Sequence, residues 1–320
     1  IIETNIDCER SITNSPKLHA HPQTGKDIPM KGSEANLLEL MEGGKNHFVI
    51  PVYQRKYDWK TENCRQLYED LKKVIRSHRS SHFFGSIVCS VQGNGSQVEY
   101  YVIDGQQRLT TVSLLLLALH NLLAQHKISS DSADLCEEIR DCYLISKYSH
   151  DSDKFKMRLL KGDRDAFRLL FGDEQDFDLT SNLTHNYQFF CDVLRKQEVS
   201  VDELYNAIGK LSVISITLDA DDNAQLIFES LNSTGLALEE GDKIRNYILM
   251  NQPPQVQNQF YEEYWLKIER CTRNDVSPFV RDYLSIKHQS TPSVNKVYQE
   301  FKTYAESTGH QIELLLQDML

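Results

Sequence analysis

The chain lacks the features of a membrane protein, a secreted protein or a zinc protein. Its longest mainly apolar stretch, Val112 to Leu119, is far too short to cross a bilayer. No basic segment followed by an apolar one opens the sequence, so a secretory signal is not expected. The seven cysteines are odd in number and include no Cys-x-x-Cys pair, which favours reduced thiols and a cytoplasmic location.

Familiar catalytic motifs are missing as well. The sequence contains no Gly-x-x-x-x-Gly-Lys-Ser/Thr loop, no His-Glu-x-x-His pair, no Gly-x-Ser-x-Gly elbow and no Gly-x-Gly-x-x-Gly fingerprint. Its eleven histidines form no recognisable metal or HNH nuclease constellation. The sequence therefore indicates none of the common P-loop, hydrolase or metalloprotease classes.

Positive charge is in deficit overall but not locally. The chain has 35 Lys and Arg residues against 46 Asp and Glu residues, a net charge of −11, which argues against unspecific coating of nucleic acid. Between Lys45 and His82, however, nine basic residues stand against four acidic ones, whereas Asp131 to Asp178 holds thirteen acidic residues against eight basic ones. An anionic ligand would prefer the first region.

The apolar pattern over the first part of the chain predicts a small mixed sheet with helices. Residues 1–32 contain turn formers without periodicity and predict an irregular arm. We then expect a helix capped by Ser33, a strand over 47–53 and a helix capped by Thr61. A β-hairpin over 83–91 and 98–103, turning at Gly93-Asn94-Gly95, leads into a leucine-rich helix over 109–123.

Beyond about residue 126 the pattern is mainly helical, so the predicted fold class is α+β. A single β-branched strand is expected over 211–218. The length favours two units, over 33–125 and 126–320, with 211–250 packing back on the first; one domain with a large insertion is the alternative. Helices are expected over 131–147, 163–171, 181–196, 201–209, 222–231, 239–250, 255–270, 276–287, 293–306 and 310–320.

The most informative segment is Asp104-Gly105-Gln106-Gln107-Arg108, which lies between the second hairpin strand and the leucine-rich helix. A helix N-terminus presents free N–H groups and partial positive charge, and glycine lets the backbone approach a phosphate closely. The glutamines can donate hydrogen bonds, Arg108 offers a planar fork, and Asp104 could hold a hydrated magnesium ion. The alternative is an ordinary helix start, with Asp104 as its cap and Arg108 in solvent.

Two further segments carry polar residues beside aromatic ones. Ile50 to Trp59 includes Tyr53, Gln54 and Arg55, where Tyr and Trp could stack on bases and Arg could meet phosphates; an edge strand with half-buried aromatics is the alternative. Phe228 to Tyr247 contains a turn at Asn232 and a charged group around Asp242, which could face a ligand or solvent.

Taken together, these segments resemble the N-terminal domain family of GmrSD-type modification-dependent restriction endonucleases, also called domain of unknown function 262. The family pattern is Ile-Pro-x-Tyr-Gln-Arg-x-Tyr-x-Trp, Phe-x-Gly-Ser/Thr, Asp-Gly-Gln-Gln-Arg-Leu-Thr-Thr and Phe-x-x-x-Asn-x-x-Gly-x-x-Leu-x-x-x-Asp. In this sequence the four parts are Ile50 to Trp59, Phe84-Gly85-Ser86, Asp104 to Thr111 and Phe228 to Asp242. The resemblance spans about residues 34–250.

The resemblance implies a ParB- or sulfiredoxin-like nucleotide-binding fold over 33–125, with phosphates at the turn from Gly105 to Arg108. It implies that the chain binds and hydrolyses a nucleoside triphosphate (GTP, UTP or ATP) with Mg²⁺. The chain would thereby regulate a bacterial modification-dependent restriction system that defends against phage. The implied catalytic residues are Asp104, Gln107 and Arg108, with Asp104 also as the Mg²⁺ ligand. Nucleotide contacts are expected from Gln54, Arg55, Gly105, Gln106, Gln107, Arg108 and Thr110, with Tyr53, Asn232 and Asp242 as further candidates.

The implied partners are DNA and an HNH nuclease domain or subunit, with a homodimer also open and no membrane. The chain shows no His-x-x-Pro nuclease set of its own, which moves DNA cleavage to a partner or another domain. Two alternatives remain open at this point: a metal-dependent DNA nuclease, and a non-catalytic module that binds DNA or a partner protein.

Overall fold

A computed structural model describes residues 31–43, 45–94, 97–146, 154–219, 222–232, 238–250, 252–309 and 311–320. Its centre is a six-stranded mixed sheet with the strand order β1-β6-β3-β4-β2-β5. The β1–β6 and β3–β4 pairs are antiparallel, and the β6–β3, β4–β2 and β2–β5 pairs are parallel. The strands are β1 (Lys31–Asn36), β2 (Asn46–Val49), β3 (His82–Asn94), β4 (Gln97–Asp104), β5 (Met157–Arg158) and β6 (Leu211–Leu218).

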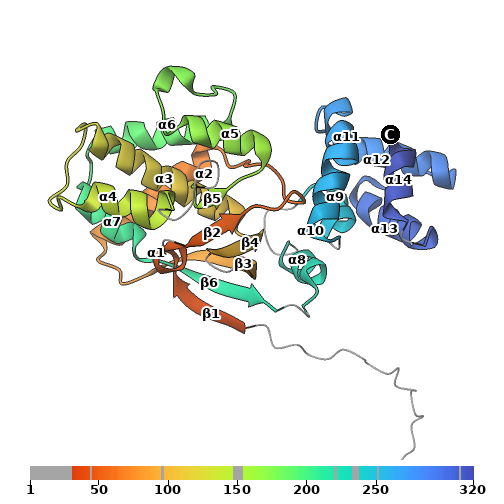
Figure 1. Cartoon of the computed structure of the whole chain (residues 1–320), viewed down its shortest axis with the longest axis horizontal. Coiled ribbons are helices and arrows are strands. Elements are labelled where there is room, and N and C mark those ends of the chain that lie inside the picture. Colours follow the sequence, from red (N-terminus) through yellow and green to blue (C-terminus); the bar gives the residue numbers. More distant parts are fainter. Residues whose placement is uncertain are drawn as a thin grey trace, which may run out of the picture.

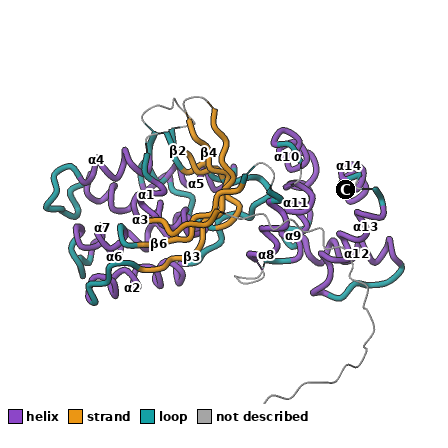
Figure 2. The backbone as a smooth tube through the Cα atoms, turned by 90° about the horizontal axis from the view of Figure 1, so that it is seen from below, coloured by secondary structure: helices purple, strands orange, loops and turns teal. Residues whose placement is uncertain are grey.

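Helices form two groups on opposite sides of the sheet, as both views show (Figure 1, Figure 2). The first group comprises α1 (Leu37–Met41), α2 (Thr61–Arg76), α3 (Gln106–Ala124), α4 (Leu135–Ile139), the π-helix η1 (Arg140–Leu144), α5 (Lys161–Leu169), η3 (Glu174–Asp176), α6 (Asn182–Arg195) and α7 (Val201–Ile208). The second comprises α8 (Ala224–Asn232), α9 (Glu240–Met250), α10 (Pro254–Phe260), the π-helix η4 (Tyr261–Trp265), α11 (Leu266–Cys271), α12 (Val276–His288), η5 (Val294–Lys296), α13 (Val297–Ser307) and α14 (Ile312–Met319).

Each face of the sheet belongs to a different hydrophobic core, because successive residues of a strand point to opposite faces. Ile87 and Val102 pack into the core formed with α1–α7. Their neighbours Val88 and Ile103 pack into the core formed with α8–α14. The sheet is therefore a wall between two cores, and the predicted mixed α+β class is confirmed. The predicted domain boundary at 125/126 stays a prediction.

The predictions for the first strand and helix are wrong in part. Residues 1–30 of the expected irregular arm lie outside the described residues, but Lys31 and Gly32 belong to β1. The helix expected from Ser33 begins at Leu37 instead, and its cap is Asn36, whose side chain accepts hydrogen bonds from the N–H groups of the first turn. The strand pairs with β6 along its whole length, and this partner overrides the local helix signal.

Other differences are small and have local causes. The strand expected over 47–53 ends at Val49, shortly before Pro51, which has no N–H to donate to a ladder. Thr61 is the first residue of α2 rather than its cap; the residue before it, Lys60, donates its N–H to the side chain of Asn63. The helix expected over 131–147 is shorter, because α4 begins at Leu135 and the single-turn π-helix η1 ends it at Leu144, whereas the π-helix η4 interrupts the helix expected over 255–270. The two hairpin strands, the helix over 109–123 and the strand over 211–218 are confirmed; Gly93 and Asn94 of the expected turn belong to β3, and Gly95 lies outside the described residues.

Candidate functional site

The turn between β4 and α3 is built around Gly105. This residue has φ +95°, in the left-handed region, and a Cβ atom there would lie 2.9 Å from the Ser86 carbonyl oxygen and 2.4 Å from Cδ1 of Ile87. Only glycine fits this conformation and this space. Gly105 is also the N-cap of α3 and has no side chain to cap the helix. The alternative in which Asp104 caps α3 is therefore wrong, and the first-turn N–H groups face no capping side chain.

Arg108 and Asp104 form an ion pair beside this turn. Arg108 Nη2 lies 3.0 Å from Asp104 Oδ2, and Arg108 Nε and Nη2 donate to the Ser86 carbonyl oxygen at 3.2 and 2.8 Å. The Ser86 hydroxyl donates to the same Asp104 oxygen at 3.2 Å. The Arg108 and Asp104 side chains are 23% and 27% exposed, so the pair is open to a ligand. Within the described residues, these contacts leave Arg108 Nη1 and Asp104 Oδ1 open.

Gly85 explains how the Arg108 guanidinium lies so close to β3. Its φ is +116°, and a Cβ atom there would lie 3.0 Å from Arg108 Nε and 3.1 Å from Cζ. The β3–β6 register shifts between Phe83 and Gly85, so Gly85 sits at a bulge. The glycine thus provides the flat surface against which the guanidinium rests.

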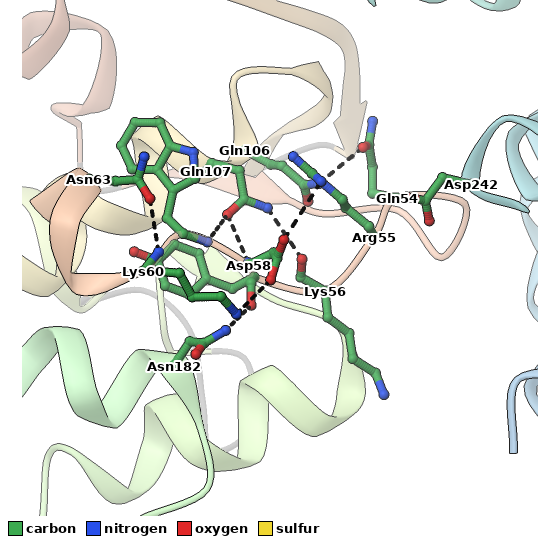
Figure 3. Close-up of polar contacts among 12 residues, drawn as sticks. Gln54, Arg55, Lys56, Asp58, Lys60, Asn63, Gln106, Gln107, Asn182 and Asp242 are labelled. Carbon is green, nitrogen blue, oxygen red and sulfur yellow. Dashed lines mark hydrogen bonds and ion pairs between the residues drawn. The ribbon is translucent and has the colours of Figure 1, made fainter. Parts of the chain in front are cut away.

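Gln54 and Gln106 connect the loop after β2 to the end of β4 (Figure 3). Gln54 Nε2 donates to the carbonyl oxygen of Ile103 at 2.6 Å, and Gln106 Nε2 donates to Gln54 Oε1 at 3.1 Å. Both glutamines are buried. These contacts hold the end of β4 in place before the Gly105 turn. They also occupy the amide groups that were predicted to contact the nucleotide.

Gln107 holds the next part of the same loop. Its Oε1 accepts the backbone N–H groups of Asp58 and Trp59 at 3.0 and 3.1 Å, and its Nε2 donates to the Lys56 carbonyl oxygen at 3.2 Å (Figure 3). The side chain is buried. The predicted catalytic role of Gln107 stays a prediction; its contacts give it the role of positioning this loop.

The helical region fixes the same loop from the other side, through residues that the sequence reasoning missed. The Tyr57 hydroxyl lies 2.7 Å from Thr111 Oγ1 and accepts from Asn186 Nδ2 at 3.0 Å, and the Tyr57 N–H donates to Asp163 Oδ2 at 2.6 Å. Burial raises the pKa of the Asp163 carboxyl to about 6. No motif marks Asp163 or Asn186, because their partners lie more than a hundred residues away.

The loop presents Arg55 to a polar cleft of about 360 Å³, which Asp242 also lines. Arg55 Nη1 lies 3.8 Å from Asp58 Oδ2. Across the cleft Asp242 pairs with the buried Arg245 at 2.7 Å. Arg55 and Asp242, which were both predicted to contact the nucleotide, line one cleft, but the Asp104–Arg108 pair does not line it.

Arg245 ties the loop after β2 to the second helical group at this cleft. Its Nε donates to the Tyr53 carbonyl oxygen at 3.0 Å, and its Nη1 pairs with Glu269 at 2.7 Å. Trp265 Nε1 donates to the same Glu269 oxygen at 3.0 Å. Arg245 and Glu269 are both buried, as is Tyr53, so the predicted nucleotide contact of Tyr53 would have to come through its backbone or after rearrangement.

For two predicted site residues, Thr110 and Asn232, the structure gives no contact with the Gly105 turn. Thr110 is 2% exposed within α3, where its side chain packs in the protein interior. Asn232 is the last residue of α8, and its side chain lies outside the described residues.

Part of the basic charge of the segment from Lys45 to His82 is neutralised, since Arg65 pairs with Glu62, Lys72 with Glu69 and Glu198, and Lys73 with Asp70.

Metal-binding capacity is limited in the described part of the chain. No group of three or more His, Cys, Asp or Glu side chains is placed there to hold a metal ion. Asp104 is a single carboxylate with a hydroxyl nearby, which fits a hydrated Mg²⁺ that is held mainly by phosphate oxygens.

Among the described helices, none combines the length and apolarity needed to cross a bilayer.

Residues 37–249 match the N-terminal domain of the GmrSD restriction endonucleases, and the chain therefore belongs to this family. No curated protein matches the chain significantly. The match covers both sides of the site, from α1 to α9. Family membership gives the chain a role in a restriction system, and with it an interaction with DNA.

Proposed function

We propose that the chain binds a nucleoside triphosphate at the start of α3 and regulates a modification-dependent restriction system by binding and hydrolysing it. The observation that carries the proposal is the uncapped helix start at Gly105, with the partly exposed Arg108 guanidinium beside it. A ParB- or sulfiredoxin-like mode of binding, with phosphates on the glycine turn, is part of the proposal.

The residues would act in the following way. Phosphate oxygens would meet the first-turn N–H groups of α3, which no side chain caps and where the helix dipole favours negative charge. Arg108 adds its free Nη1, and its contact with the Ser86 carbonyl oxygen keeps the guanidinium oriented. Gln107, in the first turn of α3, holds the loop that carries Arg55, and this loop would have to bring Arg55 to the nucleotide.

Asp104 would share its charge between Arg108 and a bound ion. A magnesium ion, when bound, supplies charge neutralisation at the phosphate oxygens. Asp104 offers Oδ1 toward it, since Oδ2 already accepts from Arg108 and Ser86. The proposal gives DNA cleavage to an HNH nuclease domain or subunit, and a homodimer would bring two such control sites together.

Titration of the full chain with Mg²⁺ and GTP, UTP or ATP tests the proposal. Replacing Arg108 by alanine should weaken binding by about 10- to 100-fold, since a hydrogen bond to a charged group contributes about 1.5–3 kcal/mol. Arg195→Ala is the matched control, because Arg195 also pairs with a carboxylate a few residues before it in the chain but lies on α6. Phosphate release should fall in Arg108→Ala and Asp104→Asn. The proposal is wrong if none of the three nucleotides binds, or if Arg108→Ala binds as tightly as Arg195→Ala.

A further inference from the structure

A second cavity, of about 240 Å³, is lined by residues of α8, α9 and α13 in the second helical group. Much of its wall is aromatic or aliphatic, with contributions from Phe228, Leu238, Tyr247 and Tyr298. It shares no lining residue with the Asp104–Arg108 pair or with the cleft at Arg55. The site proposed above therefore does not account for this cavity.

The cavity wall contains a buried hydrogen-bond acceptor without a partner. Asn246 is 3% exposed, and its Oδ1 accepts no hydrogen bond in the described structure. Native proteins almost always pair buried polar atoms, because a lost hydrogen bond to water has to be replaced. Asn246 is also one of the residues that line the cavity, so this unpaired amide is the group that a ligand with a hydrogen-bond donor would engage.

The opposite edge of the cavity is polar and already ordered. Glu229 accepts hydrogen bonds from Gln225 Nε2 at 2.9 Å and from the Tyr298 hydroxyl. Lys302 lies 3.6 Å from Glu229 and stacks over the Tyr247 ring at 5.9 Å. A ligand would thus meet aromatic faces, an unpaired amide and a charged rim in one small space.

We propose that this cavity binds a nucleobase. Flat heteroaromatic rings stack on aromatic side chains, and an Asn amide can pair with the donor and acceptor on a base edge. The volume suits one base and not a whole nucleotide chain, and the lysines beside the cavity are already paired, Lys243 with Glu240 and Lys302 with Glu229, so the ligand needs no attached phosphate. The choice of ligand rests on the proposed nucleotide- and DNA-directed function; the base could come from a free nucleotide or from an extruded DNA base.

Calorimetric titration of the full chain with adenosine, guanosine, cytidine, uridine and 5-hydroxymethylcytidine tests the proposal. These probes carry no phosphate and so bypass the Arg108 site. At least one should bind, and Asn246→Leu should weaken it tenfold or more, because leucine has the same size but no acceptor. Leu238→Trp, which fills the cavity, should abolish binding. Asn206→Leu, on the exposed face of α7, is the matched control and should bind normally.

Inorganic tripolyphosphate with Mg²⁺ separates this proposal from the previous one. Asn246→Leu should leave tripolyphosphate binding unchanged, and Arg108→Ala should leave nucleoside binding unchanged. Nucleoside binding without tripolyphosphate binding would support the cavity and refute the phosphate site. Competition by a single-stranded oligonucleotide carrying the bound base assigns the source to DNA, and its failure assigns it to free nucleotide. No binding of any nucleoside, or equal binding by wild type and Asn246→Leu, would overturn the inference.

Discussion

Replacing Gly105 by alanine tests the turn on which the proposed phosphate site depends. Placing an L-residue in the left-handed region costs about 1–2 kcal/mol. The added carbon would also lie 2.9 Å from the Ser86 carbonyl oxygen, which cannot retreat freely because it accepts two hydrogen bonds from Arg108. Forcing an extra methyl into packed surroundings costs about 1–3 kcal/mol. The expected loss of stability is therefore about 2–5 kcal/mol in total.

Thermal and urea unfolding, followed by circular dichroism, measure this loss. With about 2 °C for each kcal/mol in a chain of this size, the melting temperature should fall by about 4–10 °C. Gly93→Ala is the matched control, because nothing lies within 4 Å of the added carbon and φ is not positive there. Triphosphate affinity should fall in Gly105→Ala alone. Equal melting temperatures for the two variants would refute the steric reasoning.

Three further predictions concern the supports of the site. Burial raises the Asp163 pKa from 3.8 to about 6, so the folded chain binds more protons than the unfolded chain in this window and stability falls as pH rises through it. Asp163→Asn should flatten that slope in urea midpoints measured from pH 4 to 7, and an unchanged slope would contradict the assignment. Gln107→Leu should destabilise the chain by about 1–3 kcal/mol and speed proteolysis of the loop it holds, whereas Gln66→Leu on the exposed face of α2 should do neither. Arg245→Met leaves Glu269 buried without a counter-charge and should cost about 3–5 kcal/mol, part of which Glu269→Gln in the same chain should restore; no restoration would exclude charge as the cause.

Elements with strong local patterns could be predicted from the sequence. The hairpin strands, α3 and the strand over 211–218 follow from β-branched residues, a turn signal and a leucine-rich run. Strand β1 could not be predicted, because Lys31–Asn36 is polar and short and becomes a strand only by pairing with β6. Strand β5 has two residues and depends in the same way on β2. Non-local hydrogen bonding decides both.

The same distinction between local sequence patterns and non-local contacts applies to the residues of the candidate site. Gly105 and Arg108 lie in a contiguous motif, and the sequence placed them together at a helix start. The residues that orient Arg108 lie elsewhere in the fold, at Gly85 and Ser86 on β3. Gly85 was part of the recognised pattern, but its contact with the guanidinium depends on a bulge that only the β3–β6 pairing creates.

The place of β6 in the sheet also determines the order in which the chain can fold. Lys31 pairs with Thr217, and His82 pairs with Leu211, so both ladders join segments that are synthesised far apart. Closing such long loops costs chain entropy before the contacts repay it, and sheets of this topology fold slowly. Until β6 has left the ribosome, one edge of β3 and the whole of β1 lack their partners. A nascent or truncated chain that ends before Leu211 therefore exposes open strand edges, the kind of surface from which aggregation starts.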